Sequence, residues 1–161
     1  MSIQAVRAYF ERFGLGVRVQ EFETSSATVA LAAQALGCAP ARIAKTLSFA
    51  AEDGCILVVA AGDARVDNPK FKAAFGTKAK MLPAEQLLPL VGHGVGGVCP
   101  FAILDTARVY LDVSLQRFDV IFPACGSASS AIGLSCQELE RYAQHVQGWV
   151  DVCKDWQESA E

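Results

Sequence analysis

A single lysine interrupts an otherwise apolar segment and is the first residue here with a capacity for chemistry. Lys45 lies in Ile43-Ala44-Lys45-Thr46-Leu47, a sequence typical of a core strand. Such a lysine can extend to solvent, pair with a carboxylate, or face a cavity and bind an anion. An outward-pointing strand lysine is the simpler interpretation, and the segment alone leaves these alternatives open.

The second candidate is the glycine-rich segment from Gly92 to Phe101. It contains four glycines followed by Pro100. Glycine allows close approach to the main chain, and proline excludes a helix here. We therefore expect a loop whose backbone N–H groups can face a bound group, with a long surface turn as the alternative.

Gly126-Ser127-Ala128-Ser129-Ser130 is a second segment of small residues. It can also bring backbone donors close to a ligand. A hairpin turn is the competing interpretation.

Positive charge gathers between Arg65 and Lys80, although the whole chain has a net charge of −3. The segment has five basic residues and one acidic residue, a local charge of +4. It could contact one or two phosphates, or it could be a solvated face. A broad grip on nucleic acid would require a basic protein, so we expect any such contact to be local.

Several familiar reaction types lack their motifs. Neither His93 nor His145 accompanies a G-x-S-x-G turn, and Gly92–Gly97 lacks the ending of a phosphate-binding Walker loop. Cys99 beside His93 leaves open a thiol-dependent enzyme. The six cysteines form no C-x-x-C pair, so we expect reduced thiols, no metal and no cofactor.

Composition favours one folded domain over residues 1–161. Hydrophobic residues make up 52% and charged residues 19%, which excludes a disordered chain. No apolar run reaches the roughly 20 residues of a membrane span, and the first residues do not resemble a secretory signal. We expect a cytoplasmic protein without a membrane partner.

Hydrophobic periodicity and turn residues predict the elements that position these candidates. Helices are expected at 3–13, 28–36, 69–75, 83–88 and 135–143, and strands at 15–22, 43–50, 55–61, 79–82, 108–112, 119–123 and 131–134. Asp53-Gly54 predicts a tight hairpin, and Ser135 with Glu138 predicts a capping box. The irregular mixture predicts an α+β domain with a curved, largely antiparallel sheet.

Five segments in order resemble the YbaK/ProX family of aminoacyl-tRNA editing domains, which also occur inside some prolyl-tRNA synthetases. The similarity extends from about Val17 to Tyr142. Its segments are the alanine-rich helix 28–37, the lysine strand 43–47, the apolar strand 58–63 ending in Gly-Asp, the Gly-Gly-x-x-Pro loop 96–101, and the pair 110–112 and 124–127.

The resemblance implies a mixed α/β fold, with a curved sheet of about seven strands and flanking helices. It also implies hydrolysis of the ester between a wrong amino acid and the 3′-terminal ribose of tRNA, often tRNA for proline. The implied partners are the acceptor end of aminoacyl-tRNA and an aminoacyl-tRNA synthetase. An activated ester of this kind requires a positioned water and oxyanion donors more than a covalent nucleophile.

The site residues follow from the same resemblance. Lys45 and Gly97 are the expected catalytic residues. Substrate contacts are expected at Phe22, Thr46, Gly96, Val98, Cys99, Pro100, Gly126 and Ser127. The expected tRNA phosphate contacts, Arg65, Lys70 and Lys72, come instead from the positive charge between Arg65 and Lys80.

The chain departs from the family members that act on cysteinyl-tRNA. Ala124, Ala131 and Cys99 replace a serine, an aspartate and a serine, and Phe22 replaces a tyrosine. These replacements favour a small amino acid other than cysteine. A non-catalytic module that binds the aminoacyl or tRNA end is the alternative function.

Overall fold

The structure is a computed structural model that describes residues 2–25 and 28–156. Its helices are α1 (Ser2–Glu11), α2 (Val29–Leu36), α3 (Asn68–Phe75), α4 (Ala84–Leu90) and α5 (Cys136–Tyr142). Its strands are β1 (Val19–Glu21), β2 (Ile43–Ala51), β3 (Gly54–Ala61), β4 (Arg65–Val66), β5 (Ala107–Asp112), β6 (Phe122–Pro123), β7 (Ser130–Ile132), β8 (Val146–Val150) and β9 (Cys153–Lys154). None of the described helices is long and apolar enough to cross a membrane.

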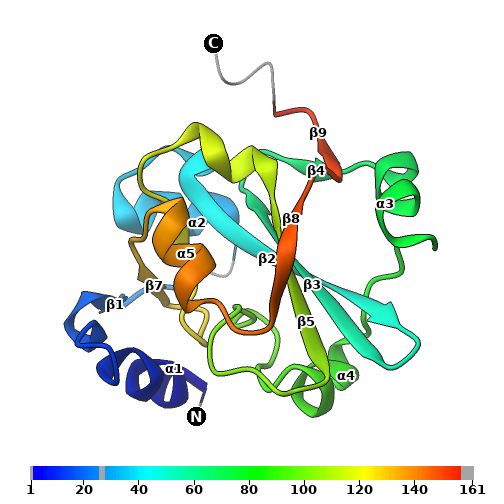
Figure 1. The fold of residues 1–161 in the computed structure, drawn as a ribbon. Helices are drawn as coiled ribbons and strands as arrows, with labels where there is room; N and C mark the ends of the chain where they lie inside the picture. Colours follow the sequence, from blue (N-terminus) through cyan, green and yellow to red (C-terminus); the bar gives the residue numbers. More distant parts are fainter. Residues whose placement is uncertain (1, 26–27, 157–161) are drawn as a thin grey trace.

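A five-stranded sheet in the order β6-β2-β3-β5-β8 forms the centre of the fold (Figure 1). The hairpin predicted at Asp53-Gly54 joins β2 and β3, with Ala51 opposite Gly54. The other neighbouring pairs in this sheet, β2–β6, β3–β5 and β5–β8, are parallel. The mixed α/β class is thus confirmed, but the expected largely antiparallel direction is wrong for the central sheet. Parallel pairing joins strands that are far apart in sequence. No turn motif between them therefore predicts the pairing.

Two strands at the end of the chain were missed by the sequence patterns. β8 pairs with β5 at the edge of the central sheet, and β9 pairs with β4. Gly148 interrupts β8 at a positive φ of 151°, which weakens its alternating pattern. Conversely, the strand expected at 79–82 is reduced to one bridge between Phe49 and Met81.

The helices are bounded by the local signals that predicted them. Thr28 caps α2 by accepting a hydrogen bond from the Leu31 N–H, and Gly37 ends the helix at φ 69°. Ser135 and Glu138 form the expected capping box of α5. Glu138 also pairs with Arg18, which ties the segment before β1 to α5. The caps thus set the ends of α2 and α5, and the Arg18–Glu138 ion pair holds α5 against the segment that leads into β1.

The core joins the central sheet to the N-terminal helix. β3 is buried from Cys55 to Ala61, as its uninterrupted apolar sequence predicts. The ring of Phe10 on α1 meets that of Phe101 with 4.7 Å between centroids. A Cβ on Gly126 would lie 2.7 Å from the Ser2 carbonyl. The start of α1, the glycine-rich loop and the 126 turn therefore form one packed unit.

Candidate active site

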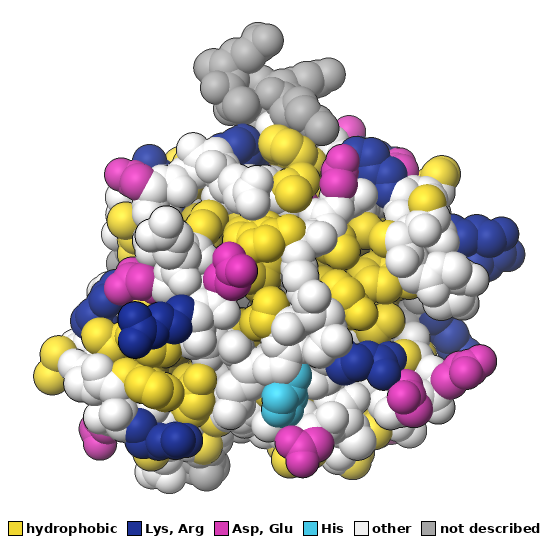
Figure 2. All heavy atoms as spheres, in the orientation of Figure 1, with side chains coloured by type: hydrophobic (Ala, Val, Ile, Leu, Met, Phe, Trp, Pro, Cys, Tyr) yellow, Lys and Arg dark blue, Asp and Glu magenta, His cyan; other side chains and the backbone are white. Residues whose placement is uncertain are grey.

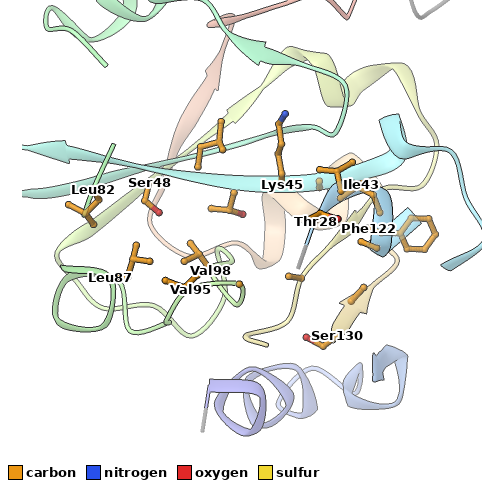
Figure 3. Close-up of a pocket in the computed structure, with 18 of the residues that line it drawn as sticks. Thr28, Ile43, Lys45, Ser48, Leu82, Leu87, Val95, Val98, Phe122 and Ser130 are labelled. Atoms are coloured by element: carbon orange, nitrogen blue, oxygen red, sulfur yellow. The ribbon is translucent and has the colours of Figure 1, made fainter. Parts of the chain in front are cut away.

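A pocket of about 330 Å³ lies against β2, between the glycine-rich loop, α2 and the turn that precedes β7 (Figure 3). Its wall is mostly apolar, with hydroxyl groups and one lysine as the polar side chains. The lining residues are Thr28, Val29, Ala32, Ile43, Ala44, Lys45, Thr46, Leu47, Ser48, Met81, Leu82, Leu87, Val95, Gly96, Val98, Phe122, Ala124, Ser130 and Ala131. Such a pocket suits a small, uncharged side chain.

The β2 wall carries two hydroxyl groups. Side chains alternate across a strand, so Thr46 and Ser48 share one face, and both line the pocket. Neither side chain makes a hydrogen bond within residues 2–25 and 28–156. Thr46 was expected at the site. Ser48 was missed, although its place two residues farther along the same strand was the signal that could have found it.

Lys45 lies on the pocket wall, but its ammonium points away from Val95 and Val98 (Figure 3). The ammonium donates hydrogen bonds to the backbone carbonyls of Gly62, at 3.3 Å, and Ala64. Burial lowers the pKa of Lys45 below its ordinary value. The ammonium of Lys45, an expected catalytic residue, is therefore directed away from the glycine-rich loop (Figure 3). Alternation along β2 directs it to the opposite face from Thr46.

Two residues of the glycine-rich loop combine a place on the pocket wall with an unpaired backbone N–H group. Gly96 and Val98 line the wall, and their N–H groups have no partner among the described residues. The Gly97 N–H instead donates to the Gly94 carbonyl at 3.1 Å. A backbone pair of this kind can stabilise an oxyanion. The donors are thus on either side of Gly97, which was the expected catalytic residue.

Gly97 shapes the site through its missing side chain. A Cβ at this position would lie 2.5 Å from the Gly126 carbonyl oxygen and 3.0 Å from the Ser127 nitrogen. The two small-residue segments therefore pack main chain against main chain. Gly126 and Ser127, expected to contact substrate, lie behind the loop and outside the pocket lining.

The turn from Gly126 to Ser130 is held by its own hydroxyl groups. The Ser127 hydroxyl donates to Ser130 Oγ at 2.9 Å, and Ser130 Oγ also accepts from the Cys125 N–H. Ser130 lines the pocket; it ends the small-residue segment noted in the sequence but was not among the expected substrate contacts. The Ser130 hydroxyl is therefore used to order the turn. The hydroxyl groups of the pocket wall that have no partner are those of Thr46 and Ser48.

Three other expected contacts lie outside the pocket lining. Phe22 follows β1, where its N–H donates to the Ser129 carbonyl at 2.8 Å. Pro100 is buried, and its carbonyl accepts from the Gln144 N–H. Cys99 is fully buried. Phe22 thus borders the turn before β7, whereas Pro100 and Cys99 support the loop from the core.

Cys99 and His93 meet inside the core. Cys99 Sγ lies 3.5 Å from His93 Nε2, and that nitrogen lies 2.7 Å from the Phe101 carbonyl oxygen. Burial raises the pKa of Cys99 to about 12 and lowers the pKa of His93. Both groups are therefore neutral at pH 7, and this pair does not supply the thiolate that a cysteine enzyme needs.

For the ester hydrolysis that the sequence resemblance implies, Cys99→Ala is expected to keep the rate within about threefold of that of the unmodified protein, because Cys99 does not line the pocket. The missing sulfur should lower the free energy of unfolding by about 1 kcal/mol. Steady-state hydrolysis and denaturant unfolding test the two effects, with Cys136→Ala as the matched cysteine control. An acyl group trapped on Cys99 would contradict this prediction.

The three residues expected to contact tRNA phosphates lie outside the pocket. Lys70 is held by Asp151 and the Cys153 carbonyl, both at 3.1 Å. Arg65 is on β4 and Lys72 is on α3. Among the described residues, no group of three His, Cys, Asp or Glu side chains is arranged to hold a metal.

Comparison with known proteins identifies similar chains over the whole fold. The family model described as an aminoacyl-tRNA editing domain matches residues 23–142. The uncharacterized protein YwhH of Bacillus subtilis (strain 168) is 51% identical over 158 residues, covering 98% of this chain and all of that protein.

Two solved structures share the architecture. One is the crystal structure of a "putative trans-editing enzyme for prolyl tRNA synthetase", with 28% identity and a TM-score of 0.84, covering 95% of this chain and 97% of that one. The other, hypothetical protein APE2540, has 26% identity and a TM-score of 0.77, covering 91% and 99%. The match to each of these three proteins spans nearly the whole of both chains.

Proposed function

Because the chain belongs to the aminoacyl-tRNA editing domain family, we propose that it hydrolyses the ester of mischarged aminoacyl-tRNA as a separate, trans-acting protein. The observation that carries this proposal is the small apolar pocket with unpaired N–H groups at Gly96 and Val98. The pocket suits an aminoacyl side chain, and the two N–H groups suit the oxyanion that forms when water attacks its ester.

The wall residues divide the chemistry among them. Gly96 and Val98 donate to the carbonyl oxygen as negative charge develops there. Thr46 and Ser48 position the attacking water or the substrate amino group through their unpaired hydroxyls. The described lining contains no cysteine, histidine or carboxylate, so we assign the attack to water and no covalent intermediate to this chain.

We infer that the amino acid is small and uncharged. The described lining has no carboxylate, and its single cation is turned to the other face of β2. A charged side chain would be desolvated there without a partner, at a high free-energy cost. Ala124 and Ala131 add further apolar surface. These features favour a short aliphatic or hydroxylated amino acid.

We assign the tRNA to the proline type, with a prolyl-tRNA synthetase as the functional partner, on the similarity to the structure described as a putative trans-editing enzyme for prolyl tRNA synthetase. The match covers 95% of this chain and 97% of that one. The proposed place of action is the cytoplasm, where tRNA is charged.

A deacylation screen tests the proposal. The wild-type protein is incubated with tRNA(Pro) charged with alanine, serine, cysteine, 2-aminobutyrate or proline, and the remaining ester is measured with time. We expect the ester of at least one small amino acid to be hydrolysed about 10²-fold or more faster than the spontaneous rate. The prolyl ester should not be hydrolysed above that rate. Binding without hydrolysis of any ester would instead support the non-catalytic module.

A further inference from the structure

The mouth of the pocket has an exposed apolar edge. Met81 and Val95 line the pocket, yet their side chains are 59% and 75% exposed. They belong to two separate segments, one beside β2 and one in the glycine-rich loop. Large apolar side chains at a pocket mouth provide contact area for a flat ligand group, and methionine adapts well to such groups.

The Met81 segment separates this pocket from a second hollow. It runs along the edge of β2, where the Ala50 N–H donates to the Lys80 carbonyl at 2.8 Å and the Leu82 N–H donates to the Ser48 carbonyl at 2.9 Å. Met81 and Leu82 line the pocket, whereas Lys80 lines the other hollow. The two linings therefore meet along this segment at the edge of β2, whereas Ile56, the partner of Phe49 on β3, lies on the opposite face of the sheet from Ser48.

The second hollow, of about 610 Å³, is apolar at its floor and basic at its margin. Ile56 and Phe75 contribute apolar surface, and Lys78, Lys80 and Arg108 contribute positive charge. Figure 2 shows hydrophobic side chains in a recess between α3 and β8, with lysine and arginine side chains below it.

The charges in this hollow are not equivalent. Arg108 is paired with both carboxylate oxygens of Asp53, at 3.0 and 3.1 Å. Lys78 and Lys80 are exposed and have no ion-pair or hydrogen-bond partner among the described residues. Glu52 lies on the same lining, so the hollow is only mildly positive. Two unpaired ammonium groups suit one or two phosphates.

We propose that the segment from Lys78 to Met81 is the track for the single-stranded 3′ end of the RNA. The terminal nucleoside lies against Met81 and Val95, and the phosphates that precede it contact Lys78 and Lys80. This assignment rests on the proposed function, since it continues the path of an ester bound in the pocket. Proteins that bind single strands use positively charged grooves that follow the phosphates and aromatic side chains that stack on the bases; here Met81 and Val95 take the place of the aromatic side chains. It also places the phosphate contacts away from Arg65, Lys70 and Lys72.

The test compares two substrates that carry the same amino acid. One is the aminoacyl-tRNA that the screen identifies, and the other is the corresponding 3′-aminoacyl-adenosine, which has no phosphate. Lys78→Glu with Lys80→Glu should raise KM for the tRNA about tenfold or more and leave hydrolysis of the aminoacyl-adenosine unchanged. The slope of log KM against log salt should become shallower by about 1.4, since two phosphate contacts to a single strand are lost.

Two further variants sharpen the test. Met81→Ala should raise KM for both substrates, because both contain the terminal nucleoside. Lys154→Glu, an exposed lysine on β9, reverses one charge outside both hollows and serves as the control for Lys80→Glu alone. An equal loss in Lys154→Glu and Lys80→Glu, or no loss in the double variant, would overturn the track.

Binding of an oligonucleotide that ends in CCA, followed by fluorescence anisotropy, separates this inference from the proposed function. If the wild-type protein hydrolyses neither ester, the proposed function fails. Weaker oligonucleotide binding by the double variant would then still support the track, and unchanged binding would overturn it.

Discussion

Gly97→Ala is expected to lower ester hydrolysis by at least about 10²-fold, the typical loss when oxyanion donors are displaced. The added Cβ would lie 2.5 Å from the Gly126 carbonyl oxygen, so the glycine-rich loop must move away from the turn behind it. That movement displaces the Gly96 and Val98 N–H groups. We expect the loss in kcat, together with about 1–3 kcal/mol of stability from overpacking.

Gly94→Ala is the matched control for that variant. It adds the same methyl group to the same loop, but a Cβ at Gly94 has no atom within 4 Å. Single-turnover hydrolysis and denaturant unfolding of both variants should separate them clearly. If Gly97→Ala hydrolysed the ester at the wild-type rate, the loop could not be the source of the oxyanion donors.

Lys45→Met is expected to have the second large effect, through position and not through contact with the substrate. Its ammonium joins β2 to the carbonyls of Gly62 and Ala64. Without it, these carbonyls lose a charged donor, which should lower the free energy of unfolding by about 1–3 kcal/mol. A shift of β2 by about 1 Å displaces Thr46 and Ser48 and can lower kcat about 10²-fold.

The division between kcat and KM distinguishes the possible roles of Lys45. A positioning role predicts a lower kcat with KM nearly unchanged, and partial rescue by Lys45→Arg. Lys154→Met, an exposed lysine on β9, controls for the loss of one positive charge. If the variant lost stability but kept its kcat, Lys45 would contribute to folding only, and the positioning role would be wrong.

Local features of the sequence were sufficient to predict most of the elements. The hairpin at Asp53-Gly54, the buried strand after it and the capping box at Ser135 all appear as expected. Each depends on residues that are neighbours along the chain, because turn geometry, strand burial and helix capping are settled over a few residues. The order of five motifs also identified the family, which the match over residues 23–142 confirms.

Tertiary structure alone decided the pairing of strands and the orientation of groups at the site. Three parallel pairings of the central sheet connect segments far apart in sequence. The same long-range packing sets Gly97 against Gly126 and buries Cys99 beside His93. Residue type and sequence motif were sufficient to select Lys45, Gly97 and Cys99 as candidate site residues. It could not show which face of β2 carries Lys45 or which N–H groups of the loop are unpaired, because both depend on contacts between segments that only the fold brings together.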